Sequence, residues 1–171
     1  MGVTMSDATS SHPLVRADRR AVEFSYSHPL NPNAEMRGVS LSAQAGLERI
    51  GFHLIRIPPG KENNIYHAHT CEEELYFVLE GRGIAEIDGE EFEIGPGDFM
   101  GFKTPSVAHL LRNPYDEDLV YLVGGERREM ELASFPKLGK YIVRARGQAW
   151  AVDEANLESF WKAEKSGDGD E

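Results

Sequence analysis

The sequence has little cysteine, little positive charge and no long hydrophobic run. Cys71 is the single cysteine among 171 residues, so no intrachain disulfide can form and a disulfide-stabilised scaffold is excluded. Eighteen Lys and Arg residues stand against 29 Asp and Glu residues, which leaves a net charge of −11. Proteins that bind nucleic acid or an anionic membrane surface need a basic surface, so this composition argues against both kinds of partner.

The hydrophobic residues occur in short stretches. The longest, residues 75–79 (L-Y-F-V-L), is far shorter than the roughly 18 residues of a membrane span. The first thirty residues lack the apolar core of a secretory signal. With a lone cysteine, this predicts a cytoplasmic protein. The length fits one domain, at about 100–200 residues per domain, and a hydrophobic content of 40% is enough for one packed core.

The central residues 47–124 predict an all-β fold, a sandwich or barrel of short strands. Apolar stretches recur at close spacing and are separated by Gly, Pro, Asn and Asp. Asp88 and Gly89 predict a two-residue hairpin turn, because both turn positions need a positive φ. The predicted strands are residues 52–57, 64–69, 74–80, 83–88, 91–94, 98–103, 107–113 and 118–123.

The residues before this core are predicted as an N-terminal arm, residues 1–46, within the same single domain. The first eleven residues are small and polar, which favours disorder. Residues 25–33 are rich in turn-forming residues and lack a regular period, so we expect no element of regular structure there.

The residues after the core are predicted as a C-terminal extension, residues 125–165. Residues 140–146 predict one more strand. We expect a short amphipathic helix over residues 153–165, with Asp153 as its cap. Its apolar side would consist of Leu157, Phe160 and Trp161. The last residues, 166–171, predict a disordered, solvated acidic tail.

The segment 60–81 has the residues that carry chemistry. Side chains two residues apart on a strand share a face, so His67 and His69 point the same way and are spaced to hold one ion. A returning antiparallel strand can bring a carboxylate opposite them. We favour Glu74, which opens an apolar stretch, and Glu72 is the second choice. If the strands close into a barrel, His109 reaches the same interior.

Three imidazoles and one carboxylate form a mixed nitrogen and oxygen ligand set that leaves positions open for water or substrate. Such a set suits Fe(II), Mn(II), Ni(II), Zn(II) or Cu(II), and it is a poor match for Ca²⁺. It lacks the thiolates of a structural zinc site. A strand histidine by itself is more often hydrogen-bonded or solvated than a ligand. The combination with spaced partners is what predicts a metal site.

These segments resemble the sequence motifs of the cupin superfamily. Residues 60–81 are similar to the first motif, and residues 97–113 are similar to the second. The resemblance implies a double-stranded β-helix, the jelly-roll barrel of cupins, over roughly residues 47–124. The chain as a whole is similar to small bacterial single-domain cupins, some of them described as sugar-phosphate-isomerase-like. The resemblance also implies one divalent transition metal per chain (Fe, Mn, Zn or Ni), bound by His67, His69, Glu74 and His109.

Further residues are candidates for roles near this site. Tyr76 shares the face of Glu74 and is a candidate catalytic residue, with a core tyrosine as the alternative. Lys103 and Arg112 are candidates for binding an anionic substrate, with solvated charges as the alternative. Cys71 is predicted at the barrel mouth, where a bystander thiol is favoured over a ligand. The remaining histidines are predicted as loop or structural residues: His12, His28 and His53.

The strand that begins at Glu74 predicts burial on both of its faces. If Glu74 and Tyr76 point into the barrel, Leu75 and Phe77 point outward, so both faces are apolar. The outward face then needs a covering layer. We favour a second copy of the chain, because cupins commonly form homodimers through such a face. A monomer wrapped by its own arms is the alternative.

The residues are compatible with three kinds of function. We favour a metal-dependent enzyme that acts on a small polar molecule, and the ligand set leaves isomerase, dioxygenase and decarboxylase chemistry open. The alternative is a non-catalytic protein that uses the metal to hold a sugar or carboxylate. A structural or regulatory protein with a vestigial site is disfavoured, because the predicted ligand residues are all present.

Overall fold

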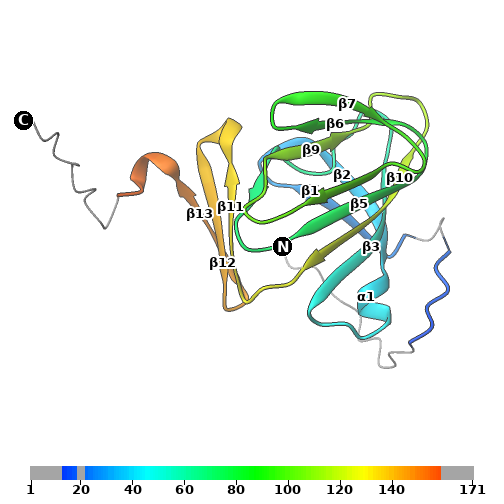
Figure 1. Cartoon of the computed structure of the whole chain (residues 1–171), viewed down its shortest axis with the longest axis horizontal. Helices are drawn as coiled ribbons and strands as arrows, with labels where there is room; N and C mark the ends of the chain where they lie inside the picture. Colours follow the sequence, from blue (N-terminus) through cyan, green and yellow to red (C-terminus); the bar gives the residue numbers. More distant parts are fainter. Residues whose placement is uncertain (1–12, 19–21, 159–171) are drawn as a thin grey trace, which may run out of the picture.

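The computed structural model of the protein describes residues 13–18 and 22–158. Two antiparallel sheets form a barrel, and a third sheet stands beside it (Figure 1). The first sheet has six strands in the order β1-β2-β3-β10-β5-β8, and the second has the order β7-β6-β9. The third has the order β13-β12-β11-β4.

The strands are short, as the punctuated sequence predicts. The helical elements of the described residues are the α-helix α1 (Leu41–Gln44) and the 3-10 turns η1 (Pro136–Leu138) and η2 (Glu154–Asn156). Within the described part of the chain, no helix has the length and apolarity needed to cross a membrane. The strands are β1 (Phe24–His28), β2 (Asn31–Ser40), β3 (Ile50–Ile57), β4 (Ala68–His69), β5 (Glu74–Glu80), β6 (Gly83–Ile87), β7 (Glu90–Ile94), β8 (Phe99–Phe102), β9 (His109–Arg112), β10 (Leu119–Glu126), β11 (Met130–Phe135), β12 (Lys140–Ala145) and β13 (Gln148–Asp153).

Both barrel sheets contribute to one hydrophobic core. Leu119 and Tyr121 of β10, Ile57 of β3 and Leu111 of β9 are among the largest fully buried side chains. Burying an aliphatic side chain of this size contributes about 1.5–3 kcal/mol. The interior of the barrel is therefore a packed core, and polar groups within it need partners.

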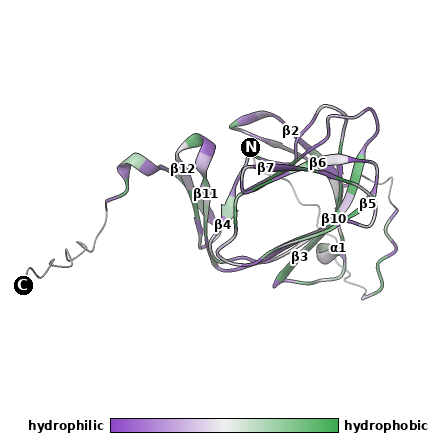
Figure 2. Cartoon of the chain, turned by 45° about the horizontal axis from the view of Figure 1, so that its top comes forward, coloured by the Kyte–Doolittle hydropathy of each residue, from purple (hydrophilic) through white to green (hydrophobic). Residues whose placement is uncertain are grey.

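Strand β5 separates two apolar environments, as its sequence predicts. Tyr76 and Val78 face the core and are buried, whereas Leu75 and Phe77 lie on the outer face and are 36% and 38% exposed. Figure 2 shows hydrophobic residues along β5. Phe99 of β8 pairs with Phe77 and is 62% exposed. The outer face of the six-stranded sheet therefore presents large apolar side chains to solvent.

The all-β jelly-roll prediction is confirmed, and the central segment has the strands that the sequence predicts with small shifts at their ends. Asp88 and Gly89 form the turn between β6 and β7, with φ values of 52° and 81°. The strand predicted over residues 64–69 is shorter. Its regular part is β4, and His67 adds an isolated bridge to the start of β9.

The prediction that residues 25–33 form no regular element is wrong. Most of them lie in β1 and β2, and β2 extends the six-stranded sheet by pairing with β3. The residues of β2 do not alternate regularly between buried and exposed positions. The sequence therefore lacks the two-residue hydrophobic period that predicts a strand. The eleven residues predicted to be disordered lie outside the described residues.

The C-terminal extension is a sheet. The strand predicted over residues 140–146 is confirmed as β12, and it lies between β11 and β13, which the sequence analysis did not predict. The helix predicted over residues 153–165 is wrong over residues 153–158, the part that the structure describes. Asp153 is instead the last residue of the edge strand β13.

The predicted helix start at Asp153 has a different structure. Asp153 ends β13, and its side chain pairs with Lys140 instead of capping a helix. Residues 154–156 form a single 3-10 turn, and the backbone is extended again at Leu157. Phe160, Trp161 and the acidic tail lie outside the described residues.

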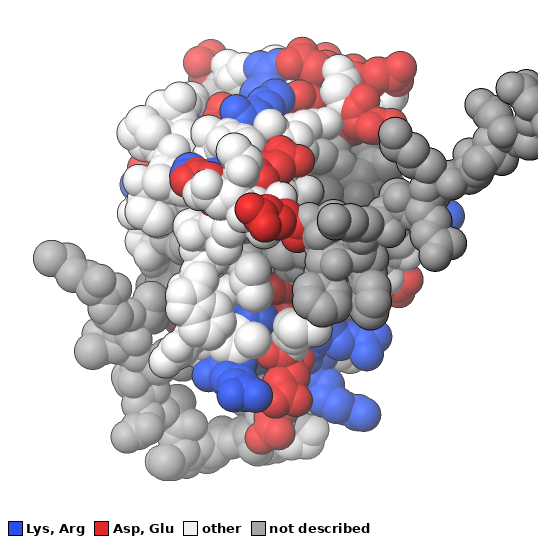
Figure 3. Space-filling view, turned by 90° about the vertical axis from the view of Figure 1, so that its left-hand side faces the viewer, with Lys and Arg blue, Asp and Glu red and all other residues white. Residues whose placement is uncertain are grey.

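Acidic side chains are numerous at the upper end of the face shown in Figure 3, where the β6–β7 hairpin lies, with some Lys and Arg among them. The lower end has several Lys and Arg side chains with acidic ones between them. Glu90, Glu91 and Glu93 of β7 are exposed. The net charge of −11 therefore has a component concentrated at this hairpin.

Gly38 allows β2 to pack against β3. A Cβ atom at this position would lie 2.2 Å from the backbone oxygen of Leu54. We expect Gly38→Ala to lower the free energy of unfolding by about 1–3 kcal/mol, because the strands must separate. Gly95→Ala is the control, since a Cβ there has the Gly81 oxygen at 3.9 Å. Equal urea midpoints for the two variants would contradict the β2–β3 packing.

Candidate metal centre

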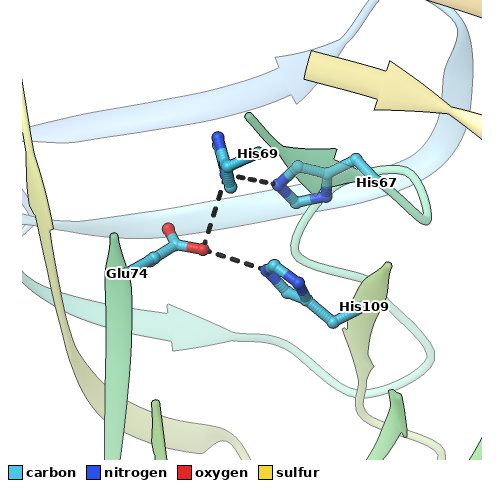
Figure 4. A group of neighbouring side chains, drawn as sticks. All are labelled: His67, His69, Glu74 and His109. Carbon is cyan, nitrogen blue, oxygen red and sulfur yellow. Dashed lines mark hydrogen bonds and ion pairs between the residues drawn. The ribbon is translucent and has the colours of Figure 1, made fainter. Parts of the chain in front are cut away.

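Four side chains with metal-binding atoms converge inside the barrel (Figure 4). His69 belongs to β4, Glu74 begins β5, His109 begins β9, and His67 immediately precedes β4. Their donor atoms all lie within 4.8 Å of one another. The structure thus brings together the four residues that the sequence analysis gives as ligands.

A pair of backbone hydrogen bonds sets His67 opposite His109. The amide of His67 donates to the His109 carbonyl at 3.1 Å, and the amide of His109 donates back at 2.8 Å. This antiparallel pairing places the two rings with their centroids 4.8 Å apart. His69, two residues along, shares the face of His67, and these two ring centroids are 4.9 Å apart.

The backbone also orients two of the rings. Nδ1 of His67 lies 2.7 Å from the Ile65 carbonyl oxygen, and Nδ1 of His109 lies 3.1 Å from the Val107 carbonyl oxygen. A carbonyl oxygen only accepts, so each of these Nδ1 atoms carries a proton. Each Nε2 atom therefore points into the cluster, which is the ring orientation that a metal ligand needs.

The distances within the cluster fit a bound transition metal. Nε2 of His67 is 3.1 Å from Nε2 of His69, and Nε2 of His109 is 3.0 Å from Oε2 of Glu74. Nε2 of His69 is 3.7 Å from the same carboxylate oxygen. Ligand atoms bound at about 2.0–2.2 Å to one ion lie roughly 3.0–3.6 Å apart. The nitrogen and oxygen donors also suit divalent transition metals.

Burial favours a neutral imidazole at His67, and the contacts of Glu74 favour its ionised carboxylate. Burial, followed by the effect of His109, lowers the pKa of His67 from 6.5 to about 3. Burial by itself raises the pKa of Glu74. The hydrogen bond to His109 and the nearby imidazoles outweigh it, so the net pKa is lowered. Neutral imidazoles and a carboxylate anion are the protonation states that bind metal.

Aromatic rings close one side of the cluster, and the other side reaches solvent. The Phe102 ring stacks on His109 with centroids 3.8 Å apart, and the Phe135 ring stacks on His67 at 5.9 Å. The His109 side chain is fully buried, whereas those of His69 and Glu74 are 16% and 19% exposed. The cluster is therefore exposed to solvent on the side of His69 and Glu74.

Tyr76 lies beside the cluster as a partner of Glu74. It is 2% exposed, and its hydroxyl donates to Oε2 of Glu74 at 2.8 Å. Burial, with the Glu74 charge second, raises the pKa of Tyr76 well above 10.0. The hydroxyl therefore keeps its proton and orients the carboxylate. Its role as a catalytic residue stays a prediction.

The two predicted anion-binding residues have different positions. Lys103 is exposed and lines a groove whose wall includes Glu74. Arg112 lies three residues beyond His109 on β9, and its guanidinium pairs with Glu91 at 2.5 Å. Lys103 thus lies on the outer side of the six-stranded sheet, and Arg112 is paired with the β6–β7 hairpin, so the anion-binding role of both stays a prediction.

The remaining predicted bystanders also have defined surroundings. His53 packs edge-on against Phe24, and His28 lies beside Tyr26 and Phe135, both outside the four-residue cluster. Cys71 is a free, partly buried cysteine in the loop between β4 and β5. His12 lies outside the described residues.

The sequence analysis did not identify Glu131 of β11, which lies next to the site. It is 3% exposed, and its carboxylate oxygen Oε1 is 3.7 Å from Nδ1 of His69. Glu131 occurs in a stretch rich in charged residues, where a buried glutamate has the same sequence context as a solvated one. Glu131 is buried because β11 pairs with β4, a strand that lies far from it in the sequence.

The chain is similar to known proteins over much of its length. The family described as "Cupin domain" matches residues 53–125. The chain is similar to a crystal structure from Acidithiobacillus ferrooxidans that is described, provisionally, as a sugar phosphate isomerase. The two are 38% identical with a TM-score of 0.78, over 81% of this chain and 88% of the other.

Two curated relatives match shorter segments. An oxalate-binding protein of Thermotoga maritima is 31% identical over 71 residues, which are 42% of this chain and 57% of that protein. An uncharacterized protein of Methanocaldococcus jannaschii is 37% identical over 57 residues, 33% of this chain and 45% of that protein. The chain therefore spans about half the length of these curated relatives.

The neutral state of buried His67 predicts acid sensitivity of the metal-free protein. Its pKa is 6.5 without burial and about 3 in the fold, so between these values the unfolded chain binds the extra proton. The associated stability is complete above about pH 6.5 and decreases as the pH falls toward 3, by up to about 1.4 kcal/mol per pH unit. Urea unfolding in chelator measures this slope, and His67→Gln flattens it. Identical slopes in both proteins would contradict the burial of a neutral His67.

Proposed function

Because the chain belongs to the cupin superfamily, we propose that it binds one divalent transition metal in the barrel and acts as a metal-dependent enzyme on a small polar substrate. The observation that carries this proposal is the convergence of His67, His69, Glu74 and His109. When bound, the metal supplies Lewis acidity toward an oxygen atom of the substrate. The exposed side of the cluster, at His69 and Glu74, is where the substrate approaches.

The side chains around the four ligands have separate tasks in this proposal. Tyr76 orients the Glu74 carboxylate through its hydroxyl. Phe102 and Phe135 stack on two of the imidazoles and keep water from the buried side. Lys103 lines the groove on the outer face of the six-stranded sheet, with Leu75 and Phe99, so its part in binding an anionic substrate stays a prediction apart from the four-residue cluster.

We propose a phosphorylated sugar as the first substrate class to test. The support is the similarity to the Acidithiobacillus ferrooxidans protein, which carries that provisional description at 38% identity. Isomerisation of such a substrate moves a hydrogen from the carbon next to the carbonyl group to the carbonyl carbon itself, while a proton moves between the two oxygen atoms. A divalent metal held by the four residues would supply Lewis acidity toward the carbonyl oxygen. Dioxygenase and decarboxylase reactions use the same kind of ligand set and are the other reaction types to assay.

A non-catalytic binding protein is the second candidate function. The hydroxyl of Tyr76 donates to Glu74, and the guanidinium of Arg112 pairs with Glu91. Neither the candidate catalytic residue nor this candidate substrate-binding residue therefore has its polar group free for a substrate. The similarity to the oxalate-binding protein of Thermotoga maritima also favours this candidate. In this case the metal holds a carboxylate or sugar without turnover.

Metal content is the primary test. We expect purified wild-type protein to contain about one transition metal ion per chain by elemental analysis, and the variant with both His67→Ala and His69→Ala to contain almost none, because half of the ligands are lost. His28→Ala is the control, since His28 lies outside the cluster. Equally low metal content in wild type and double variant would refute the proposed metal site.

The metal-loaded protein then separates the two functions. Turnover of a sugar phosphate, measured by the change in aldose and ketose forms, supports the enzyme. Binding of oxalate or a sugar phosphate by calorimetry without product supports the binding protein. In both cases the double variant is the negative control, because the signal depends on the metal.

We also propose that the protein is a cytoplasmic homodimer, joined through the outer face of the six-stranded sheet. Exposed apolar side chains, including Phe77 and Phe99, lie on this face beside a groove of about 900 Å³. A contiguous apolar surface of this kind is typical of a protein interface. The free cysteine is compatible with a reducing compartment.

The oligomeric state can be measured by size-exclusion chromatography with light scattering. We expect a dimer for the wild type and a monomer for Phe99→Glu, because a charge on the apolar face opposes burial. Phe92→Glu is the control, as Phe92 is 46% exposed on β7, which belongs to the other barrel sheet. A monomeric wild type would favour the alternative in which residues 13–15, which line the same groove, cover the face.

A further inference from the structure

The C-terminal sheet brings a buried carboxylate to the back of one metal-ligand histidine. Glu131 of β11 is 3% exposed, and its Oε1 atom lies 3.7 Å from Nδ1 of His69. The pairing of Ala133 with His69 between β11 and β4 holds this position. Glu131 lies beyond residues 53–125, the segment that matches the cupin family, so this contact is an addition of the flanking chain.

His69 differs from the other two histidines in what orients its ring. Nδ1 of His67 and of His109 each contact a backbone carbonyl oxygen, whereas Nδ1 of His69 is buried and makes no hydrogen bond within the described residues. A buried ring nitrogen without a partner is unfavourable. The group that faces this atom is the Glu131 carboxylate.

A neutral His69 ring has two competing tautomers in this environment. With the proton on Nδ1, the ring faces the negative charge of Glu131, and Nε2 is free to bind a metal. With the proton on Nε2, the ring can donate to Nε2 of His67, 3.1 Å away, and its metal-binding position is blocked. A negative charge behind Nδ1 favours the first tautomer.

The carboxylate is held in place by the loop that joins β4 to β5. Glu131 Oε1 accepts the amide of Thr70 at 2.8 Å, and Oε2 accepts the amide of Cys71 at 3.0 Å. The amide of Thr70 also lies 3.1 Å from the Leu132 carbonyl oxygen. These contacts fix the carboxylate while leaving one side of Oε1 directed at His69.

Glu131 could orient His69, or it could form a second metal site with His69 and Glu72. The contacts of Glu72 distinguish these two roles. His69, Glu72 and Glu131 place donor atoms within 4.8 Å of one another. Glu72 already accepts the amide of Arg128 at 2.6 Å and pairs with the guanidinium of Arg144. Its negative charge is thus compensated by the chain, and both oxygens of Glu131 accept amide protons. This arrangement favours a structural carboxylate over a second ion.

We propose that Glu131 is a positioning residue for the metal centre, which holds His69 in the Nδ1-protonated tautomer and so keeps its Nε2 atom available to the metal. The proposal rests on the proposed metal-binding function. The sheet β13-β12-β11-β4 then contributes to metal binding through the single carboxylate of Glu131, which lies outside the segment that matches the cupin family.

The tautomer of His69 in metal-free protein is the direct test. Long-range ¹H–¹⁵N correlation spectra at about pH 8, above the usual histidine pKa of about 6.5, distinguish a proton on Nδ1 from one on Nε2. We expect Nδ1–H for His69 in the wild type and a shift toward Nε2–H in Glu131→Gln. Glu129→Gln, at an exposed position with the same loss of charge, is expected to match the wild type.

Zinc affinity is the second measurement, made by competition with a chelator. Loss of a carboxylate that orients a metal-bound histidine typically weakens metal affinity about 10–100-fold, and we expect this for Glu131→Gln and no change for Glu129→Gln. An Nε2–H tautomer in the wild type, or an unchanged Nδ1–H tautomer in Glu131→Gln, would overturn the proposal.

These results separate the positioning role from the proposed function. If the wild type binds no metal, the proposed function fails, while the tautomer in the metal-free protein still decides the role of Glu131. The wild-type spectrum requires no substitution. The proposal therefore remains open to refutation even if Glu131→Gln does not fold.

Discussion

The buried carboxylate of Glu74 is the group on which the arrangement of the site depends. A charge in an apolar barrel costs several kcal/mol unless other groups compensate it. One oxygen of Glu74 lies 3.0 Å from Nε2 of His109 and accepts the hydroxyl of Tyr76 at 2.8 Å. Backbone carbonyls hold His67 and His109 with their Nε2 atoms toward the same point. The polar interior of the barrel is thus organised around one negative charge and is suited to a cation.

Local sequence patterns were enough to predict the part of the site that follows strand geometry. The two-residue spacing of His67 and His69 fixes their common face, and the alternation from Glu74 onward separates the core from the outer apolar face. The placement of His109 opposite them depended on closure of the strands into a barrel, with which the resemblance to the second cupin motif agrees, because no local period reveals a pairing across forty residues. That pairing consists of backbone hydrogen bonds, which any residue type can make.

The parts of the structure that the sequence did not predict are those in which burial or pairing depends on residues far away in the chain. Strands β1 and β2 alternate weakly, since β2 has several half-buried residues, and β13 is almost wholly exposed. Aspartate is a common helix cap, but the pairing of β13 with β12 places Lys140 beside Asp153, and the two side chains form an ion pair. Glu131 is the clearest case, because a glutamate in a charged stretch becomes buried only when β11 meets β4.

The position of Glu131 in the chain also gives the site an order of assembly during protein synthesis. The four proposed ligands are complete at residue 109, whereas the carboxylate behind His69 comes at residue 131. At about 5–20 residues per second, the ribosome makes this carboxylate roughly one to four seconds after the last ligand. A nascent chain therefore has its full set of proposed ligands before it has β10, which joins β3 to β5, and before it has the carboxylate that packs behind His69.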